Sequence, residues 1–350
     1  MKKKLFITLS LLIIFFISIF ISYSSKKNTE IAQTSVDTVT DIDEFIANET
    51  MKTDEKGSLS PYTGLILNED ESMFDSFLAI IENSRQARPQ SGLSQSDFVY
   101  EVMTEGGITR FMALFNSKYS EKIGPIRSAR YYFLDIAKEF DLPFAHCGGS
   151  YDSLEELSKN TKLKSINEIK YGTYFFRDNS RKSPHNLYTS TENIENFLDN
   201  NTFSETNMRK LNFDDDFWIN ADLENCQNID LNLSNYYSTS YTYSENGYIK
   251  SMDGEESIDA ATNEPLIFNN IVIQFTSIKQ KEDEQYMNIE LLGSGDALII
   301  SNGKYIKGTW NKVNNQSTTI IKDINNKEIP LSVGNTIWHI IDTQNKIKIY

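Results

Sequence analysis

Residues 98–115 read FVYEVMTEGGITRFMALF, and this stretch predicts the element around which the chain folds. Two strand-like runs, Phe98–Thr104 and Thr109–Phe115, flank the pair Gly106-Gly107. Two strands joined by Gly-Gly are typical of a β-hairpin, because glycine supplies the positive φ angles that tight turns need. We therefore expect an antiparallel pair of strands here.

The spacing of this hairpin predicts which side chains face one another. If the two glycines form a two-residue turn, Met103 lies opposite Arg110, and Glu101 and Glu105 are diagonal neighbours of the arginine. One interpretation is a cross-strand ion pair on a solvated face, which contributes little to stability. The other is a carboxylate that acts as a general acid or base and is held by the arginine.

Mixed helical and strand-like patterns surround the hairpin in residues 59–210. Apolar residues recur at helical spacing in Tyr131–Phe140, and Thr191–Leu198 is a further helix candidate. Leu142–Ala145 is a short run that is typical of a strand, and Asp152–Leu157 opens with the Asp and Glu spacing of a helix start. This part of the chain is predicted to be a mixed α/β domain.

Residues 211–350 change to short alternating runs separated by asparagine and glycine turns. Ile271–Phe275 and Thr336–Ile341 are two such runs, and Asn302-Gly303 is one such turn. This pattern predicts a mostly antiparallel β domain. The expected fold class is therefore α+β, with a mixed α/β N-terminal domain followed by a mostly antiparallel β C-terminal domain, behind an N-terminal membrane helix.

The start of the chain carries a membrane signal. Three lysines at positions 2–4 precede a nearly continuous apolar run from Leu5 to Ile21. We expect residues 1–23 to form a signal-like segment or a transmembrane anchor, and both cleavage and retention stay open. Residues 24–58 are polar and acidic, which is typical of a flexible stalk. A single-pass anchor of this kind makes the cytoplasmic membrane a partner and places the body outside the cell.

The charge pattern excludes one class of function and marks one segment. The chain has a formal net charge of -15, which does not fit a nucleic-acid-binding protein because phosphate binding needs a surplus of cations. All eight arginines fall between Arg85 and Arg209, where they and eight lysines balance 16 acidic residues. Arginine binds carboxylates and phosphates with two parallel hydrogen bonds, so we expect the site in this segment.

The segment Gly124–Arg130 predicts either an anion site or a set of internal ion pairs. Arg127 and Arg130 come directly before a predicted helix, and cations in a first turn oppose the helix dipole unless a negative group lies beside them. The helix-start amides, Ser128 and the two arginines would form a socket for an anion. Acidic groups of the protein itself would satisfy the arginines equally well.

The segment His146-Cys147-Gly148-Gly149-Ser150 follows a predicted short strand and precedes a predicted helix. Open α/β sheets place ligands at such a position, where the two glycines would let a ligand approach the backbone and Ser150 would donate a hydrogen bond. Neighbouring residues of a strand point to opposite faces, so His146 does not activate Cys147 directly, and we expect a buried thiol.

The loop Phe176–Asn186 is rich in charged and hydrogen-bonding groups, including Arg181, His185 and Asn186. Many such loops are simply solvated. Two of the three histidines and several arginines nevertheless fall in one domain, which favours their convergence on one pocket. A metal site from His146, His185 and a carboxylate matches no ligand spacing, and we expect neither a metal nor a cofactor.

Several motifs carry a family resemblance that covers about residues 60–350. They are Ala87–Leu93, Val99-Tyr100-Glu101, Glu105–Phe111, Ile123–Arg130, His146 with Gly148-Gly149-Ser150, Arg181–Tyr188, Gly293-Ser294-Gly295, Asn302-Gly303 and Lys307–Trp310. Together they resemble the YerB-like family, which is classed as bacterial lipoproteins with two domains of unknown function. The resemblance implies an extracytoplasmic, membrane-tethered protein of a bacterial envelope, and it implies no mechanism. The chain has no cysteine after its apolar run to accept a lipid, so its tether would be the apolar helix.

Two functions stay open. The first is a non-enzymatic envelope protein that binds an anionic ligand, such as a cell-wall polymer or the acidic loop of an envelope protein, through an arginine-rich pocket. The second is an envelope hydrolase or transferase that acts on cell-wall material with glutamate acid/base chemistry. The ligand-binding candidates are Arg110, Arg127, Ser128, Arg130, Gly148, Gly149, Ser150, Arg181 and Asn186, and the catalytic candidates are Glu101, Glu105, His146 and His185. We favour binding, because no nucleophile and base occur at a recognised spacing.

Overall fold

The computed structural model describes residues 58–67, 75–203, 209–282 and 285–350. The predicted anchor at residues 1–23 and all but the last residue of the predicted stalk lie outside this part of the chain. Within the described ranges, no helix is both long and apolar enough to cross a membrane.

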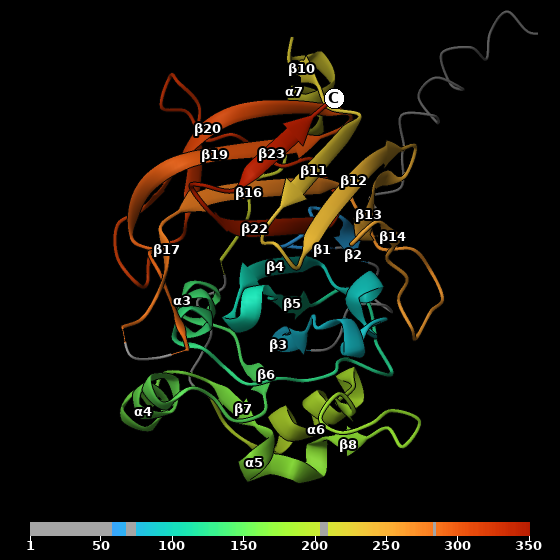
Figure 1. The fold of residues 1–350 in the computed structure, drawn as a ribbon, viewed down its shortest axis with the longest axis vertical. Coiled ribbons are helices and arrows are strands. Elements are labelled where there is room, and N and C mark those ends of the chain that lie inside the picture. Colours follow the sequence, from blue (N-terminus) through green and yellow to red (C-terminus); the bar gives the residue numbers. More distant parts are fainter. Residues whose placement is uncertain (1–57, 68–74, 204–208, 283–284) are drawn as a thin grey trace, which may run out of the picture. The chain divides into compact units, whose positions relative to one another are not determined.

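One sheet of eleven strands runs through both halves of the sequence (Figure 1). Ten strands follow the order β10-β20-β19-β16-β22-β4-β5-β3-β6-β7, and β21 pairs with β20. Their bounds in this order are Glu224–Asn225, Lys304–Lys312, Gly293–Ser301, Asn270–Thr276, Thr336–Asp342, Phe98–Met103, Thr109–Phe115, Phe77–Glu82, Phe144–His146 and Ser165–Asn167, with Ile320–Lys322 for β21. Strand β22 runs parallel to β4, from Thr336 beside Phe98 to Ile340 beside Val102, so the two halves share this sheet.

A second sheet comes from the C-terminal half alone. Its six antiparallel strands follow the order β14-β13-β12-β11-β23, with β15 paired to β13. Their bounds are Glu255–Glu256, Gly247–Met252, Ser238–Ser244, Asn228–Asn232 and Lys346–Ile349, with Ile267–Phe268 for β15. Leu231 and Tyr241 of this sheet share a core cluster with Val99 of β4 and Ile337 of β22. The second sheet therefore packs on one face of the main sheet.

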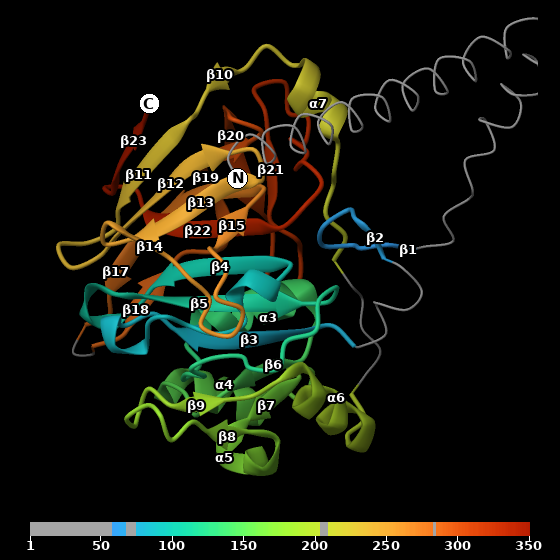
Figure 2. The same ribbon diagram turned by 90° about the vertical axis from the view of Figure 1, so that its right-hand side faces the viewer.

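Helix α3 (Tyr131–Phe140) covers the opposite face of the main sheet. Its Phe133 and Leu134 belong to one core cluster with Tyr100 of β4 and Met112 of β5. The other α-helices in the described ranges are α4 (Tyr151–Lys159), α5 (Glu168–Tyr171), α6 (Thr191–Asn200) and α7 (Asp215–Asn220). Three short strand pairs also form there: β1 (Ser58–Leu59) with β2 (Ile66–Leu67), β8 (Phe176–Arg177) with β9 (Leu187–Tyr188), and β17 (Ile278–Gln280) with β18 (Met287–Ile289). Figure 2 shows α4, α5 and α6 around β6 and β7, away from the second sheet.

The predicted fold class is confirmed in part: among the described residues the N-terminal region is mixed α/β and the C-terminal region is mostly antiparallel β, whereas the predicted membrane helix lies outside them. The hairpin strands and helix α3 form where the sequence predicts them. Strand β4 is buried on both faces, as its nearly continuous apolar sequence indicates.

The predicted register of the hairpin is wrong by one residue. Arg110 lies opposite Val102, and Met103 lies opposite Thr109. The turn contains three residues, because Glu105 joins the two glycines in a 3-10 turn that the Thr104 amide closes by donating to the Ile108 carbonyl. A shift of one residue moves a side chain to the other face of a strand. Glu101 and Arg110 consequently lie on opposite faces of the sheet.

Glu101 instead lies in the core between the two sheets. Its side chain is completely buried, and Lys250 of β13 donates to it from Nζ at 2.8 Å. Tyr237, Thr109 and Asn83 also donate to this carboxylate. Burial is the largest single effect on Glu101 and raises its pKa, but the Lys250 ammonium, the nearby His339 and the hydrogen bonds from Lys250 and Tyr237 together bring the pKa down to about 2. The carboxylate is therefore a charged, fully bonded part of the core.

His339 of β22 extends the same buried network. Its Nε2 lies 2.7 Å from the Tyr241 hydroxyl, and its Nδ1 lies 3.5 Å from the Glu101 carboxylate. Burial lowers the pKa of His339 to about 3, so the ring stays neutral. The two sheets are thus joined by hydrogen bonds as well as by apolar packing.

A second buried carboxylate joins the halves on the other face. Glu139 of α3 accepts hydrogen bonds from Arg209, from Lys312 of β20 at 2.8 Å and from the Thr319 amide. All three charged side chains are at most 4% exposed. In both networks a buried carboxylate of the N-terminal half is therefore paired with a lysine of the C-terminal half.

Replacing Lys250 with methionine is expected to lower the free energy of unfolding by about 3–5 kcal/mol, because it leaves the Glu101 carboxylate buried without a cation. Urea denaturation of the full-length chain measures this loss. The double variant Glu101→Gln/Lys250→Met keeps the acceptor for Tyr237 and Thr109 and is expected to recover more than half of it. A single variant as stable as the wild type would contradict this role.

Acid is expected to destabilise the chain in two steps. In the folded state His339 stays neutral down to about pH 3, whereas in the unfolded state the same ring takes up a proton below the ordinary histidine pKa of 6.5. The stability that is present above pH 6.5 is therefore lost as the pH falls. Glu101 stabilises the fold above its ordinary pKa of 4.5, and this contribution is lost as the pH falls toward about 2. Urea unfolding of the wild type and of His339→Gln between pH 7 and pH 5 checks the first step, which should be shallower in the variant.

Candidate functional site

Three neighbouring parallel strands end at one edge of the main sheet. Strand β3 runs parallel to β6, and β6 runs parallel to β7. Their carboxyl ends present Glu82, Cys147 and Glu168, each at or directly after the last strand residues. Ligands of open α/β sheets bind at such strand ends, so this edge of the sheet is the leading candidate for a ligand site.

Glu82, at the end of β3, accepts several hydrogen bonds on its carboxylate. Its side chain is only 3% exposed and accepts hydrogen bonds from Arg127 Nη2 at 2.9 Å, from Ser84 and from His185 Nδ1 at 3.0 Å. The Nε of Arg127 is buried and has no acceptor among the described residues. The second ring nitrogen of His185 makes no hydrogen bond in that part of the chain either, and the side chain is 22% exposed. His185 is therefore held by a carboxylate while one nitrogen stays available.

Cys147 and Glu168 continue this edge at the ends of β6 and β7. The Cys147 thiol donates to Glu168, and Arg177 contacts the same carboxylate at 3.6 Å and donates to the Asn186 side chain. Burial and the Glu168 carboxylate raise the pKa of Cys147 to about 11. The thiol is therefore protonated, although Cys147 is only partly buried rather than fully buried as expected. We call the six residues Glu82, Arg127, Cys147, Glu168, Arg177 and His185 the strand-end cluster.

The Gly148-Gly149 pair lies beside this cluster but is covered by the protein itself. A side chain at Gly148, which has φ +63°, would meet Ile169, and one at Gly149 would meet Ser153. The Ser150 hydroxyl donates to Asp152 and to Ser153. The glycines thus give helices α4 and α5 room to pack, and the structure does not leave this backbone open to a ligand.

Arg110, Arg130 and Glu105 form a separate group at the hairpin turn. Arg130 binds Glu105 with two hydrogen bonds of 2.6 and 2.9 Å, and Arg110 donates to the Ser128 carbonyl and lies 3.8 Å from Glu105. The Tyr286 ring packs over the Arg130 guanidinium. Burial, together with the positive charge of Arg130, lowers the pKa of Arg110 to about 10. Of the predicted pair of carboxylates, only Glu105 is beside Arg110.

The eight arginines all have acceptors within the chain. Arg181 donates to the backbone carbonyls of Ala87 and Arg88 and to the Tyr188 hydroxyl, so it braces the fold rather than lining the strand-end cluster. Arg209 is buried against Glu139. The alternative in which the protein's own acidic groups satisfy the arginines therefore applies to most of them.

The four catalytic candidates do not converge. No hydrogen bond or ion pair joins any two of Glu101, Glu105, His146 and His185 in the described ranges. His146 is buried with both ring nitrogens engaged, by the Gly148 carbonyl and the Ser165 hydroxyl, and burial lowers its pKa to about 4. Only His185 keeps a free nitrogen at the surface. Its carboxylate partner, Glu82, is missed by sequence reasoning because it ends an apolar run and reads as the last residue of a strand.

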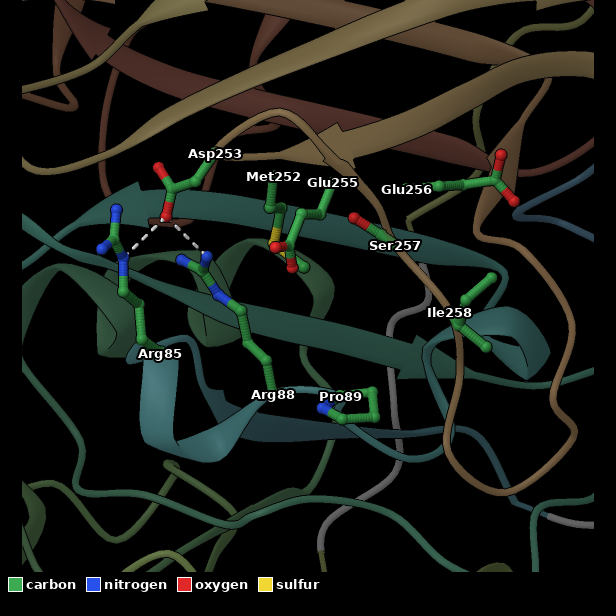
Figure 3. Close-up of a pocket in the computed structure, with 9 residues that line it drawn as sticks. All are labelled: Arg85, Arg88, Pro89, Met252, Asp253, Glu255, Glu256, Ser257 and Ile258. Carbon is green, nitrogen blue, oxygen red and sulfur yellow. Dashed lines mark hydrogen bonds and ion pairs between the residues drawn. The ribbon is translucent and has the colours of Figure 1, made fainter.

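A cavity of about 470 Å³ lies beyond the predicted site residues (Figure 3). It lies between the segment Arg85–Pro89 and the segment Met252–Ile258, and Asp253 accepts from both Arg85 and Arg88. These segments come from different halves of the sequence, so no local spacing could pair them. A further cavity of about 500 Å³ opens beside Glu105, between the hairpin turn and the β17–β18 pair, and no arginine is among its lining residues.

Comparison with known proteins identifies relatives of this chain and a family to which it belongs. Residues 62–204 match the N-terminal domain and residues 228–338 the C-terminal domain of a protein of unknown function, DUF3048. The chain is 31% identical over 289 residues to the putative lipoprotein YerB of Bacillus subtilis. The matched region covers 81% of this chain and 86% of that protein. The crystal structure of the YerB protein from Bacillus subtilis is similar with a TM-score of 0.74 and 29% identity, over 83% of this chain and 99% of that one. This chain therefore belongs to the YerB-like family, whose members combine the two DUF3048 domains.

Proposed function

We propose that this chain is an extracytoplasmic protein of the bacterial cell envelope that binds an anionic ligand at the strand-end cluster. The lipoprotein name of the Bacillus subtilis relative supports a body held outside the cytoplasmic membrane. The charged flanks and apolar run of residues 1–23 support a tether at the N-terminus. The ligand is a phosphate or carboxylate group of the kind that a cell-wall polymer or an acidic loop of an envelope protein presents.

One observation supports an anionic ligand: two partly exposed guanidinium groups, of Arg127 and Arg177, lie on the same side of the strand-end cluster, near Cys147. The side chains of Arg127 and Arg177 are 25% and 50% exposed. Both guanidinium groups lie near the Cys147 thiol, because both lower its pKa, against the larger increase that burial and Glu168 cause. Each contacts one carboxylate of the cluster and leaves further N–H donors unused. Arginine forks bind oxyanions with paired hydrogen bonds, and the unused donors supply such pairs.

The arginines outside the cluster do not support this proposal. Arg110 and Arg130 are buried against Glu105 and the Ser128 carbonyl, with side chains 12% and 10% exposed. Their charges are therefore held by the protein itself. The binding face is consequently the outer rim of the cluster, at Arg127, Arg177 and His185.

The Arg177→Ala variant is expected to weaken binding by about tenfold or more, because it removes a charge-assisted hydrogen bond. Co-sedimentation of the full-length chain with isolated cell-wall fragments, in competition with inorganic phosphate, measures the change. Lys159→Ala is the matched control, since its side chain is 68% exposed and it lies outside the cluster and outside both cavities. Equal binding by the two variants would exclude the strand-end cluster as the site.

A second candidate function, an envelope hydrolase or transferase, is favoured by the pair Glu82 and His185. A buried carboxylate that accepts from Nδ1 orients the ring and leaves Nε2 to accept or donate a proton, which is the arrangement of a general base. The acid/base group would then be His185, oriented by Glu82, and neither Glu101 nor Glu105 would take part. The protonated Cys147 does not support a thiolate nucleophile, so a water or hydroxyl of the substrate would attack.

The enzymatic alternative predicts turnover of cell-wall fragments that depends on His185. Mass spectrometry of fragments incubated with the full-length chain detects new products. His185→Gln and Glu82→Gln are expected to lower the rate by about a hundredfold or more, whereas Glu155→Gln, on the exposed side of α4, should leave it unchanged. Binding without products in the wild type would leave the chain a binding protein.

A further inference from the structure

The cavity in Figure 3 has an unusual balance of charge for an arginine-lined space. Two arginines and three acidic residues line it, which gives a net charge of −1. Both arginines already bind one carboxylate, because Asp253 Oδ2 accepts from Arg85 at 3.2 Å and from Arg88 at 2.8 Å. Arg88 is further engaged by Asn83, to which it donates from Nε and Nη2. The positive charge of the cavity is therefore largely used within the protein.

The negative charge of the cavity is not used in the same way. Glu255 and Glu256 form β14, an end strand of the second sheet, and both residues are exposed. Neither side chain makes a hydrogen bond or an ion pair with any residue that the structure describes. Figure 3 shows the Glu255 carboxylate directed into the space above Arg88 and Pro89. An occupant that brings a positive charge would complete this side of the cavity.

Ser257 gives an independent indication of an occupant. It lines the cavity and is only 4% exposed, yet its hydroxyl has no hydrogen-bond partner in the described part of the chain. A buried hydroxyl without a partner costs free energy, so such groups are rare unless a ligand or an ordered water satisfies them. In Figure 3 its oxygen points toward the Glu255 side of the cavity. A donor bound beside Glu255 would satisfy it.

The remaining walls are apolar. Met252, Pro89 and Ile258 line the cavity beside the acidic residues. Methylene groups pack favourably on such walls while a terminal charged group reaches polar partners, as the stems of lysine side chains do. The volume of about 470 Å³ lies in the range of small-molecule sites.

We infer that this cavity binds a primary ammonium group on an aliphatic stem, as the side chain of a lysine-like residue in a peptide or a free diamine carries it. The Glu255 carboxylate faces the ammonium, and Glu256, whose carboxylate points away from Glu255 in Figure 3, adds negative charge from the same strand. The Ser257 hydroxyl accepts a hydrogen bond from the ammonium, and Met252 and Pro89 hold the stem. This ligand is opposite in charge to the one proposed for the strand-end cluster. The two proposed sites are therefore tested by separate experiments, and the failure of one does not affect the other.

Binding is tested with three probes on the full-length chain, purified in a mild detergent and titrated by calorimetry. N-acetyl-lysine amide carries the ammonium on its stem, N-acetyl-norleucine amide has a similar stem without the charge, and cadaverine is the free diamine. The lysine probe is expected to bind about tenfold or more tightly than the norleucine probe, and added salt should weaken it. Tighter binding of the lysine probe than of cadaverine points to a peptide, and the reverse points to a free amine. Equal binding of the lysine and norleucine probes, or no binding of any probe, overturns the inference.

Two variants separate ligand binding from folding. Glu255→Gln/Glu256→Gln is expected to lower the affinity for the lysine probe by about tenfold or more, whereas Glu245→Gln, an exposed acidic residue outside the cavity, should not. Ser257→Ala removes an unsatisfied hydroxyl, so the free protein should melt at the same or a higher temperature while the increase caused by the lysine probe is lost. Retention of full affinity by the double variant, or an undiminished increase in Ser257→Ala, also overturns the inference.

Discussion

The buried pair of Glu101 and Lys250 is the constraint on which the arrangement of the two sheets depends. A charged pair without solvent is tolerated only if its geometry is good and its remaining polar atoms are bonded. Lys250 Nζ meets that condition with Glu101, Thr239 and the Tyr241 hydroxyl, at 2.6–2.9 Å. Because the carboxylate belongs to β4 and the ammonium to β13, a shift of either sheet by one residue would leave both charges unpaired. The pair thus specifies the register of the packing, whatever it contributes to net stability.

The same constraint decides which chemistry the N-terminal half can offer. It withdraws Glu101 from any reaction and fixes the face of β4 and β5 that packs on the second sheet. Pairing of β4 with β22 then closes one side of the N-terminal strands, and β3, β6 and β7 extend on the other side. Their carboxyl ends carry side chains that the core does not use. The strand-end cluster therefore lies where the shared sheet leaves polar groups at the surface.

Local patterns predict the elements well and their long-range partners poorly. Helix α3 has its predicted bounds because apolar spacing is a property of consecutive residues. The hairpin strands are also predicted, but the pair Gly106-Gly107 does not reveal that Glu105 belongs to the turn. This error of one residue shifts the predicted register, so the prediction places Glu101 on the face of Arg110 instead of the opposite face. The sharing of one sheet by β4 and β22 leaves no local signal at all. At the site, His185 is a sequence candidate, whereas Glu82 becomes one only when the fold brings the two together.

The arginines confined to one segment differ in how completely the fold uses them. Arg181 and Arg209 are braces: one binds backbone carbonyls and the other a buried carboxylate, and both use the planar fork to satisfy several acceptors at once. A lysine at either position would leave acceptors unsatisfied. Arg177 satisfies one carboxylate and one amide and leaves half of its side chain in solvent, which a brace does not need. This half-exposed guanidinium of the strand-end cluster is the reason that we propose Arg177, and not Arg181 or Arg209, for the ligand.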